Sequence, residues 1–334
     1  MDGDVIERVR KQRKARPPTA AWASTVAFLI VTAADWEAWQ PSSGYAPDTQ
    51  VRMLLRAIFG LHSTFTDEVW LWRGQADEAH GLEPAMHSRV RTSDGLAYAE
   101  GNVSWATQEL LTTARESGLG RIGDFRLPDL ALLAHLQHHG AATPLLDVSV
   151  DPLVALWMAT HASGGAVDAA DDKNALLFAI RKPPASHHLE PLDSRPYLDA
   201  TAPDIASSMR SNSLSWFRPP DVSERLRIQR GSFLLGPLTN PADSPSSLPL
   251  KVKAKEIWLK KRIDQLGKQG QPTKARTDVA VFEIRSALKS KLRIWLKERA
   301  GLDVATVYPT AWNRPFLDQF CSAYGRRRPI EYRA

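Results

Sequence analysis

The spacing of apolar residues predicts helices and strands in alternation along most of the chain. Apolar positions recur with helical periodicity in residues 51–59, 102–116, 128–137 and 286–299. Short apolar runs typical of buried strands occupy residues 25–31, 69–74, 175–180 and 279–284, and residues 225–235 look like a turn that leads into a strand. Residues 35–39 look like the start of a helix, and residues 82–89 look like an extended or turn segment. Helices and strands are therefore both expected, without any repeat or heptad pattern.

The polar segments between these elements suggest how the chain is divided. Residues 1–19 form a polar, basic leader that ends in Pro17 and Pro18. Residues 20–334 are expected to form a single domain, because 43% of the 334 residues are apolar and a chain of this length can bury a large core. Regions rich in proline and serine interrupt it at about 181–223 and 237–278, where we expect insertions.

Cysteine content and the N-terminal pattern bear on localisation. The single cysteine, Cys321, cannot form an internal disulfide, which favours a reducing compartment and hence the cytoplasm. The alternative is a secretory signal, since basic residues precede the apolar run 20–34 and residues 31–33 resemble a cleavage site. That run is too short to span a bilayer, so no membrane is expected as a partner, and its residues 25–31 fit a buried strand equally well.

Basic residues are concentrated near the C-terminus. The net charge is +6, and residues 251–299 contain fifteen Lys and Arg against five acidic residues. With Trp258 and Trp295, this region could contact nucleic acid. The alternative is a solvated helical face whose tryptophans belong to the core.

Polar residues are densest between His135 and Ala159. Gln137 and His138 end a predicted helix, Gly140 interrupts it, and a short apolar run then delivers Asp147 and Ser149. Asp151 and Pro152 open another helix, with Asp151 or Ser149 as its cap. The free amides of such a helix start favour phosphate or carboxylate groups.

A second polar group follows the predicted strand 69–74. Arg73 is expected at the end of this strand, before a flexible turn formed by Gly74 and Gln75. An arginine in this position can project into a cleft at the strand edge. The alternative is that it pairs with a nearby carboxylate, Asp77 or Glu78.

These two segments together resemble the FRG-domain family. The first signature is Trp72-Arg73-Gly74-Gln75, and the central one extends from Gln137 through Gly140, Thr143 and Asp147 to Ser149. Later matches are Gln229 to Phe233 and Tyr308-Pro309, so that the resemblance extends over residues 35–320. Pro144, Val148 and Ser149 depart from the pattern, and the first two change the expected shape of the pocket.

The resemblance implies an α+β protein with a split, mostly antiparallel sheet flanked by helices, similar to the ADP-ribosyltransferases. In the arginine class of that superfamily, an early strand supplies an arginine, a middle strand supplies a hydroxyl motif and a late strand supplies a glutamate. Arg73, Thr143 with Ser149, and Gln229 occur here in the corresponding order. The parallel rests on order alone.

Cleavage of the nicotinamide–ribose bond of NAD requires an anchor for the diphosphate, groups that hold the ribose and negative charge near a developing cation. Arg73 could bind the diphosphate, His138, Thr143 and Ser149 the ribose hydroxyls, and Trp72 a flat ring. Gln229 cannot serve as a base, so Asp147 is the favoured carboxylate, with Glu224 as the alternative. The expected catalytic residues are Arg73, His138, Asp147 and Gln229, and the expected NAD-binding residues are Trp72, Gly74, Gln75, Gln137, Gly140, Thr143 and Ser149. A structural interpretation also exists, in which Asp147 caps the helix at Pro152 and His138 bonds a loop carbonyl.

The favoured function is an NAD-consuming ADP-ribosyltransferase or NAD glycohydrolase, and such an enzyme would suit a toxin or antiviral effector. Its acceptor could be a protein, a nucleic acid or water. The alternative is a non-catalytic module that binds nucleic acid or a nucleotide signal through residues 251–299. Other chemistry is disfavoured: His135 and His139 lack the glutamate of a zinc HExxH motif, and no serine-hydrolase or phosphate-loop motif occurs. Gly118, Gly120 and Gly123 follow a helix instead of a strand, so they do not form a dinucleotide fingerprint.

Overall fold

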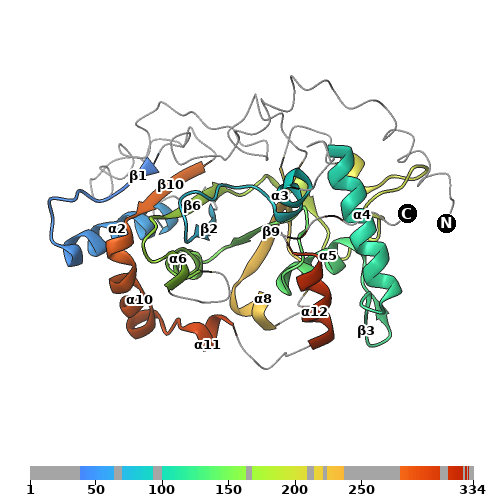
Figure 1. Cartoon of the computed structure of the whole chain (residues 1–334). Helices are drawn as coiled ribbons and strands as arrows, with labels where there is room; N and C mark the ends of the chain where they lie inside the picture. Colours follow the sequence, from blue (N-terminus) through green and yellow to red (C-terminus); the bar gives the residue numbers. More distant parts are fainter. Residues whose placement is uncertain are drawn as a thin grey trace, which may run out of the picture.

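A computed structural model of the chain describes residues 38–63, 70–92, 100–162, 168–208, 214–220, 224–236, 279–308, 315–325, 328 and 330. The expectations for the leader 1–19, the apolar run 20–34 and the insertion 237–278 lie outside these residues. Within them, the longest predicted elements are present, and a mixed sheet with helices around it forms an α+β protein (Figure 1).

The main sheet has eight strands in the order β1-β10-β6-β2-β5-β9-β8-β7. Their bounds are β1 Ala38–Trp39, β2 Trp70–Gln75, β5 Leu146–Ser149, β6 Ala175–Arg181, β7 His188–Leu189, β8 Ser215–Phe217, β9 Gly231–Leu235 and β10 Val279–Ile284. Only the two outermost pairs, β1 with β10 and β7 with β8, are parallel. The expectation of a mostly antiparallel sheet is therefore confirmed for the described strands. A separate hairpin joins β3 (Arg121–Ile122) to β4 (Phe125–Arg126).

The sheet consists of two halves that meet between β2 and β5, and we call this place the joint. Strands β2 and β5 are paired only between Trp72 and Ser149. By contrast, β2 is paired with β6 from Trp70 to Gln75, and β5 is paired with β9 along its whole length. The ladder is thus interrupted in the middle of the sheet, where Arg73 and Asp147 lie.

The helices are α2 Pro47–Ser63, α3 Ala85–Thr92, α4 Glu100–Glu116, α5 Asp129–His138, α6 Pro152–Thr160, α7 Ile205–Ser208, α8 Glu224–Ile228, α10 Ser286–Ala300, α11 Val304–Val307 and α12 Pro315–Ala323. Short 3₁₀ turns occur at Asp168–Ala170 and Ala185–His187. Gly301 ends α10 in the left-handed conformation, which favours glycine.

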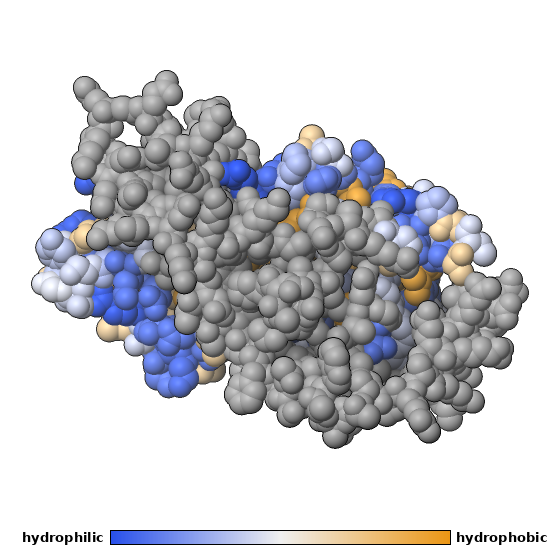
Figure 2. Space-filling view, turned by 90° about the horizontal axis from the view of Figure 1, so that it is seen from above, coloured by the Kyte–Doolittle hydropathy of each residue, from blue (hydrophilic) through white to orange (hydrophobic). Residues whose placement is uncertain are grey.

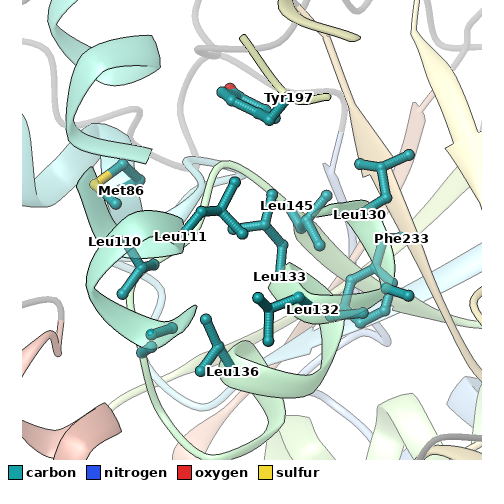
Figure 3. Close-up of a cluster of buried hydrophobic side chains, with 14 of the residues drawn as sticks. Met86, Leu110, Leu111, Leu130, Leu132, Leu133, Leu136, Leu145, Tyr197 and Phe233 are labelled. Atoms are coloured by element: carbon teal, nitrogen blue, oxygen red, sulfur yellow. The ribbon is translucent and has the colours of Figure 1, made fainter. Parts of the chain in front are cut away.

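Two apolar clusters lie against one face of the sheet. In the first, leucines of α5 pack with α3, α4 and Phe233 of β9 (Figure 3). In the second, α2, α6 and α10 cover β2, β6 and β10, and Trp72 is one of the buried side chains. Because Phe233 is opposite Asp147 and Trp72 is opposite Ser149, alternation along the strands places both clusters on the same face. The joint between β2 and β5 lies between them.

Several expected elements differ from the structure. Residues 38–39 form a strand that pairs with β10, whereas the sequence pattern of residues 35–39 favours the start of a helix. Residues 85–92 are helical, because Met86 and Val90 bury their side chains in the α4–α5 cluster. The expected insertion at 181–223 contains a short 3₁₀ turn and helix α7, and also two strands, β7 and β8, that its irregular pattern does not reveal.

Within the described part of the chain, no helix is long and apolar enough to cross a bilayer. Seen from above, the end of the molecule that includes α2 and α10 presents mainly hydrophilic residues (Figure 2).

Candidate functional site at the joint of the sheet

Asp147 occupies the joint because the local sequence turns directly from strand to helix. Leu146 and Val148 are buried on the opposite face, so alternation directs Asp147 toward the helical face of the sheet. Its side chain is 57% exposed. Asp151 caps α6 by accepting a hydrogen bond from the Leu153 amide at 2.9 Å. The interpretation of Asp147 as the helix cap is therefore wrong, and its carboxylate is available for other contacts.

Arg73 reaches Asp147 from the neighbouring strand. Its Nη1 donates a hydrogen bond to the Asp147 carbonyl at 2.9 Å and lies 3.6 Å from Asp147 Oδ2. The arginine side chain is 18% exposed, which limits how far solvent screens this pair. Arg73 thus bridges the two halves of the sheet, and it pairs with Asp147, not with Asp77 or Glu78 as in the alternative interpretation.

A hydrogen-bond chain orients the carboxylate from the other side. The hydroxyl of buried Thr143 accepts the Leu145 amide at 3.2 Å and donates to Gln137 Oε1. Gln137 Nε2 then donates to Asp147 Oδ1. This sequence of donors is self-consistent, because a carboxylate can only accept and the amide must therefore present its NH₂ group to Asp147. Thr143 and Gln137 fix the orientation of Asp147.

His138 lies beside this chain in an apolar environment. Both of its ring nitrogens are buried, and neither has a hydrogen-bond partner among the described residues. The ring meets Phe233 edge-on at 6.0 Å between centroids. Burial, reinforced by the charge of Arg225, lowers the pKa of His138 to about 3. The imidazole is consequently neutral near pH 7. The interpretation that the His138 ring donates a hydrogen bond to a loop carbonyl is wrong for the described residues.

This depressed pKa predicts that stability falls in mild acid. In the unfolded chain His138 takes up a proton near pH 6.5, whereas in the folded protein it stays neutral until about pH 3. Protonation therefore favours the unfolded state as pH falls through this window, by up to about 2 kcal/mol at pH 5. Urea unfolding of wild type and His138→Phe at pH 7 and pH 5 measures the effect. The variant is expected to lose less stability between the two values, and an equal loss in both proteins would contradict the assignment.

Two further residues, Tyr308 and Arg225, complete a polar cluster whose other members are Arg73, Gln137, His138, Thr143 and Asp147. We refer to these residues as the cluster. Tyr308 follows α11, and its hydroxyl lies 3.6 Å from Met158 Sδ of α6. The Arg225 guanidinium carbon lies 4.1 Å from the centre of the Tyr308 ring, and its Nη1 donates to the His138 carbonyl at 2.7 Å. Burial raises the pKa of Tyr308; the charge of Arg225 opposes the rise and that of Asp147 adds to it. The phenol therefore lies within the electrostatic influence of both groups.

The structure separates three of the expected NAD-binding residues from this cluster. Trp72 is fully buried in the α6 core and stacks near Phe282, so it cannot stack on a ligand held by Arg73. Gly74 and Gln75 continue the strand instead of forming a flexible turn, and they pair with Leu177 and Leu176. The Gln75 side chain donates to the Gly81 carbonyl at 3.2 Å.

Two further expected NAD-binding residues, Ser149 and Gly140, and the expected catalytic residue Gln229 have structural roles beside the cluster. The Ser149 hydroxyl donates to the Gln229 carbonyl at 2.7 Å and accepts the Asp151 amide at 3.0 Å. The Gln229 side chain donates to the Val307 carbonyl at 3.1 Å, which fixes the backbone just before Tyr308. Gly140, two residues after the end of α5, adopts a φ of +97°, a conformation that favours glycine.

Sequence reasoning does not identify Arg225 and Tyr308 as site residues. Tyr308 belongs to a Tyr-Pro pair that stands out in the sequence only as a family feature. Arg225 lies four positions before Gln229 in the late block, and nothing in its local pattern distinguishes it from Arg227 or Arg230. Its position near His138 arises from the packing of α8 beside the joint.

Most of the cations in the described part of the basic region 251–299 bind groups within the protein, whereas Lys297 and Arg299 are exposed. The Lys289 amine is buried and donates to the Ala76 and Ala170 carbonyls. Arg293 pairs with Asp171 at 2.6 Å, and Lys291 pairs with Asp48 at 2.7 Å. Trp295 packs against the α6 core. Residues 251–278, including Trp258, lie outside the described residues.

Comparison with known families identifies the central part of the chain. Residues 68–165 match the FRG domain, a shorter range than the expected 35–320. This range contains Arg73, Gln137, His138, Thr143 and Asp147, whereas Arg225 and Tyr308 lie after it. No curated protein and no solved structure matches the chain.

Proposed function

Because residues 68–165 form an FRG domain whose polar residues meet at the joint of the sheet, we propose that this protein consumes NAD, as an ADP-ribosyltransferase or NAD glycohydrolase. The observation that carries the proposal is the position of the Arg73 guanidinium 3.6 Å from the Asp147 carboxylate, contributed by different halves of the sheet. A cation for phosphate and an anion for a developing positive charge are the two groups that this reaction requires.

In the proposed complex, Arg73 binds the diphosphate and Asp147 faces the nicotinamide ribose. Guanidinium groups bind phosphate oxygens with two parallel hydrogen bonds, which suits a role in orienting the dinucleotide. Neutral His138 has both a donor and an acceptor nitrogen for a hydroxyl or carboxamide group. Gln137 and Thr143 act as positioning residues, because they reach the substrate only through Asp147.

The proposed reaction breaks the bond between C1′ of the ribose and the nicotinamide nitrogen. The electron pair of this bond moves to the ring nitrogen, so that nicotinamide leaves as a neutral molecule and positive charge develops at C1′. The Asp147 carboxylate stabilises this charge. An acceptor oxygen, from water or a macromolecule, then forms a bond to C1′, and its proton passes through Asp147 to the solvent.

The direct test is to incubate the full chain with NAD and to measure nicotinamide by chromatography. Wild-type protein is expected to release nicotinamide. Arg73→Gln is expected to weaken NAD binding by about 30-fold, because it removes one charge-assisted phosphate contact. An Arg121→Gln variant is a suitable control, since Arg121 lies in the exposed β3–β4 hairpin. Absence of nicotinamide release by the wild type would refute the proposal, whether or not NAD binds.

A nucleic-acid-binding function predicts a different result in the same preparation. Affinity for RNA or DNA would fall steeply with salt and would be unaffected by Arg73→Gln. The described contacts of Lys289, Lys291 and Arg293 do not favour that function, because these cations already bind groups within the protein.

A further inference from the structure

Arg225 is a cation at the site for which the described residues provide no anionic partner. None of their carboxylates forms an ion pair with it, and its Nε is buried without a hydrogen-bond partner. The other two arginines of the same segment are paired: Arg227 lies 3.9 Å from Glu224 and Arg230 lies 3.8 Å from Asp151. Among the three arginines of this described segment, Arg225 is therefore the one without a carboxylate partner, and it is also the one that contacts His138 and Tyr308.

The surroundings of Arg225 hold its guanidinium in place without neutralising it. The Tyr308 ring lies against one face, and the His138 carbonyl accepts from Nη1. A partly buried cation without a counter-ion is costly to maintain, and such groups are found where a ligand supplies the missing charge. Both neighbours lie near Asp147: the His138 ring meets Phe233, which is paired with Asp147 in the sheet, and the charge of Asp147 acts on the Tyr308 phenol.

Arg73 alone is poorly suited to bind a diphosphate. Its Nη1 is already bound to the Asp147 carbonyl and lies close to the carboxylate, so part of its charge is offset within the protein. A diphosphate near Asp147 would also be repelled by that carboxylate. A second cation that is not paired with a carboxylate would offset this repulsion.

We propose that Arg225 is a second anion-binding residue of the site and that it contacts the diphosphate of the substrate. The identity of the ligand as a dinucleotide rests on the proposed NAD-consuming function, whereas the anion site itself rests on a guanidinium that no described carboxylate neutralises. Arg225 thereby becomes a specificity-determining residue that selects ligands with a diphosphate.

The experiment is calorimetric titration of the full chain with ADP-ribose, which carries the diphosphate and lacks nicotinamide. Arg225→Gln is expected to weaken binding at least about 30-fold, and to reduce the dependence of affinity on NaCl concentration, because one charge contact is lost. Arg227→Gln is a matched control on the same helix and is expected to change affinity less than about twofold. Arg225→Lys keeps the charge and is expected to lose about tenfold; it serves as the test if Arg225→Gln does not fold.

The outcomes distinguish this inference from the proposed reaction. Equal affinity of ADP-ribose for wild type and Arg225→Gln, or an unchanged salt dependence, would overturn the anion site even if nicotinamide is released. Failure of the wild type to bind ADP-ribose would overturn it as well. Conversely, binding that depends on Arg225 without any release of nicotinamide would support the anion site and refute the reaction.

Discussion

Replacing Asp147 by asparagine is expected to lower the rate of nicotinamide release by about 10³-fold. The substitution removes the negative charge that opposes the developing cation while preserving the size of the side chain. The side-chain carbonyl of the new asparagine can still accept from Gln137 Nε2, and the bond from Arg73 to the backbone carbonyl of residue 147 is unaffected. The loss should therefore appear in kcat. The midpoint of urea denaturation should change little, because the Asp147 side chain is 57% exposed.

Asp172→Asn provides the control for this experiment. Asp172 is an exposed carboxylate that pairs with Lys173, so its removal changes the net charge by the same amount without altering the joint. ADP-ribose should bind Asp147→Asn at least as tightly as wild type, because a repulsive charge has been removed. If the Asp147→Asn enzyme retained more than about a tenth of the wild-type rate, Asp147 would not be the carboxylate of the reaction.

Gly74→Ala is expected to destabilise the folded protein by about 3 kcal/mol or more. A β-carbon at this position would lie 1.9 Å from the Ala155 carbonyl oxygen and 2.5 Å from the Ala159 nitrogen, both in the backbone of α6. Because backbone atoms cannot rotate away, β2 and α6 must separate. This movement would also shift Arg73, the preceding residue, relative to Asp147.

The midpoint of urea denaturation measures this effect, with Gly44→Ala as the matched control. At Gly44 the nearest atom to an added β-carbon is Ser42 Oγ at 3.8 Å, an ordinary contact, so a change within about 0.5 kcal/mol is expected. A Gly74→Ala protein as stable as the Gly44→Ala protein would show that α6 does not pack on β2 as closely as described.

The convergence of Arg73 and Asp147 could be predicted because each belongs to a recognisable apolar strand. The family resemblance placed both in ordered blocks, and the structure brings them within ion-pair distance. The assignment of Trp72 was wrong because its side chain is fully buried in the core beside Phe282, a contact that depends on the pairing of distant segments.

Other features depend on long-range packing that local patterns do not report. The strand β1 exists because Ala38 and Trp39 pair with β10, more than 240 residues later in the sequence. The helix α3 follows Leu82-Glu83-Pro84, a pattern typical of a turn, and is fixed by the burial of Met86 and Val90. Arg225 reaches His138 across 87 positions, and its importance lies in the lack of a carboxylate among the described residues around it, which no motif encodes.

The single rung between Trp72 and Ser149 has a mechanical consequence. Two half-sheets joined by so few backbone hydrogen bonds depend on side-chain contacts to stay together. The hydrogen bond from Arg73 to the Asp147 carbonyl is one of these contacts. Arg73 belongs to β2, and Arg225 belongs to α8, which packs on β9. A dinucleotide bound to both arginines would therefore link the two halves of the sheet across the joint. Substrate would then stiffen the whole sheet, and its departure would let the halves move independently.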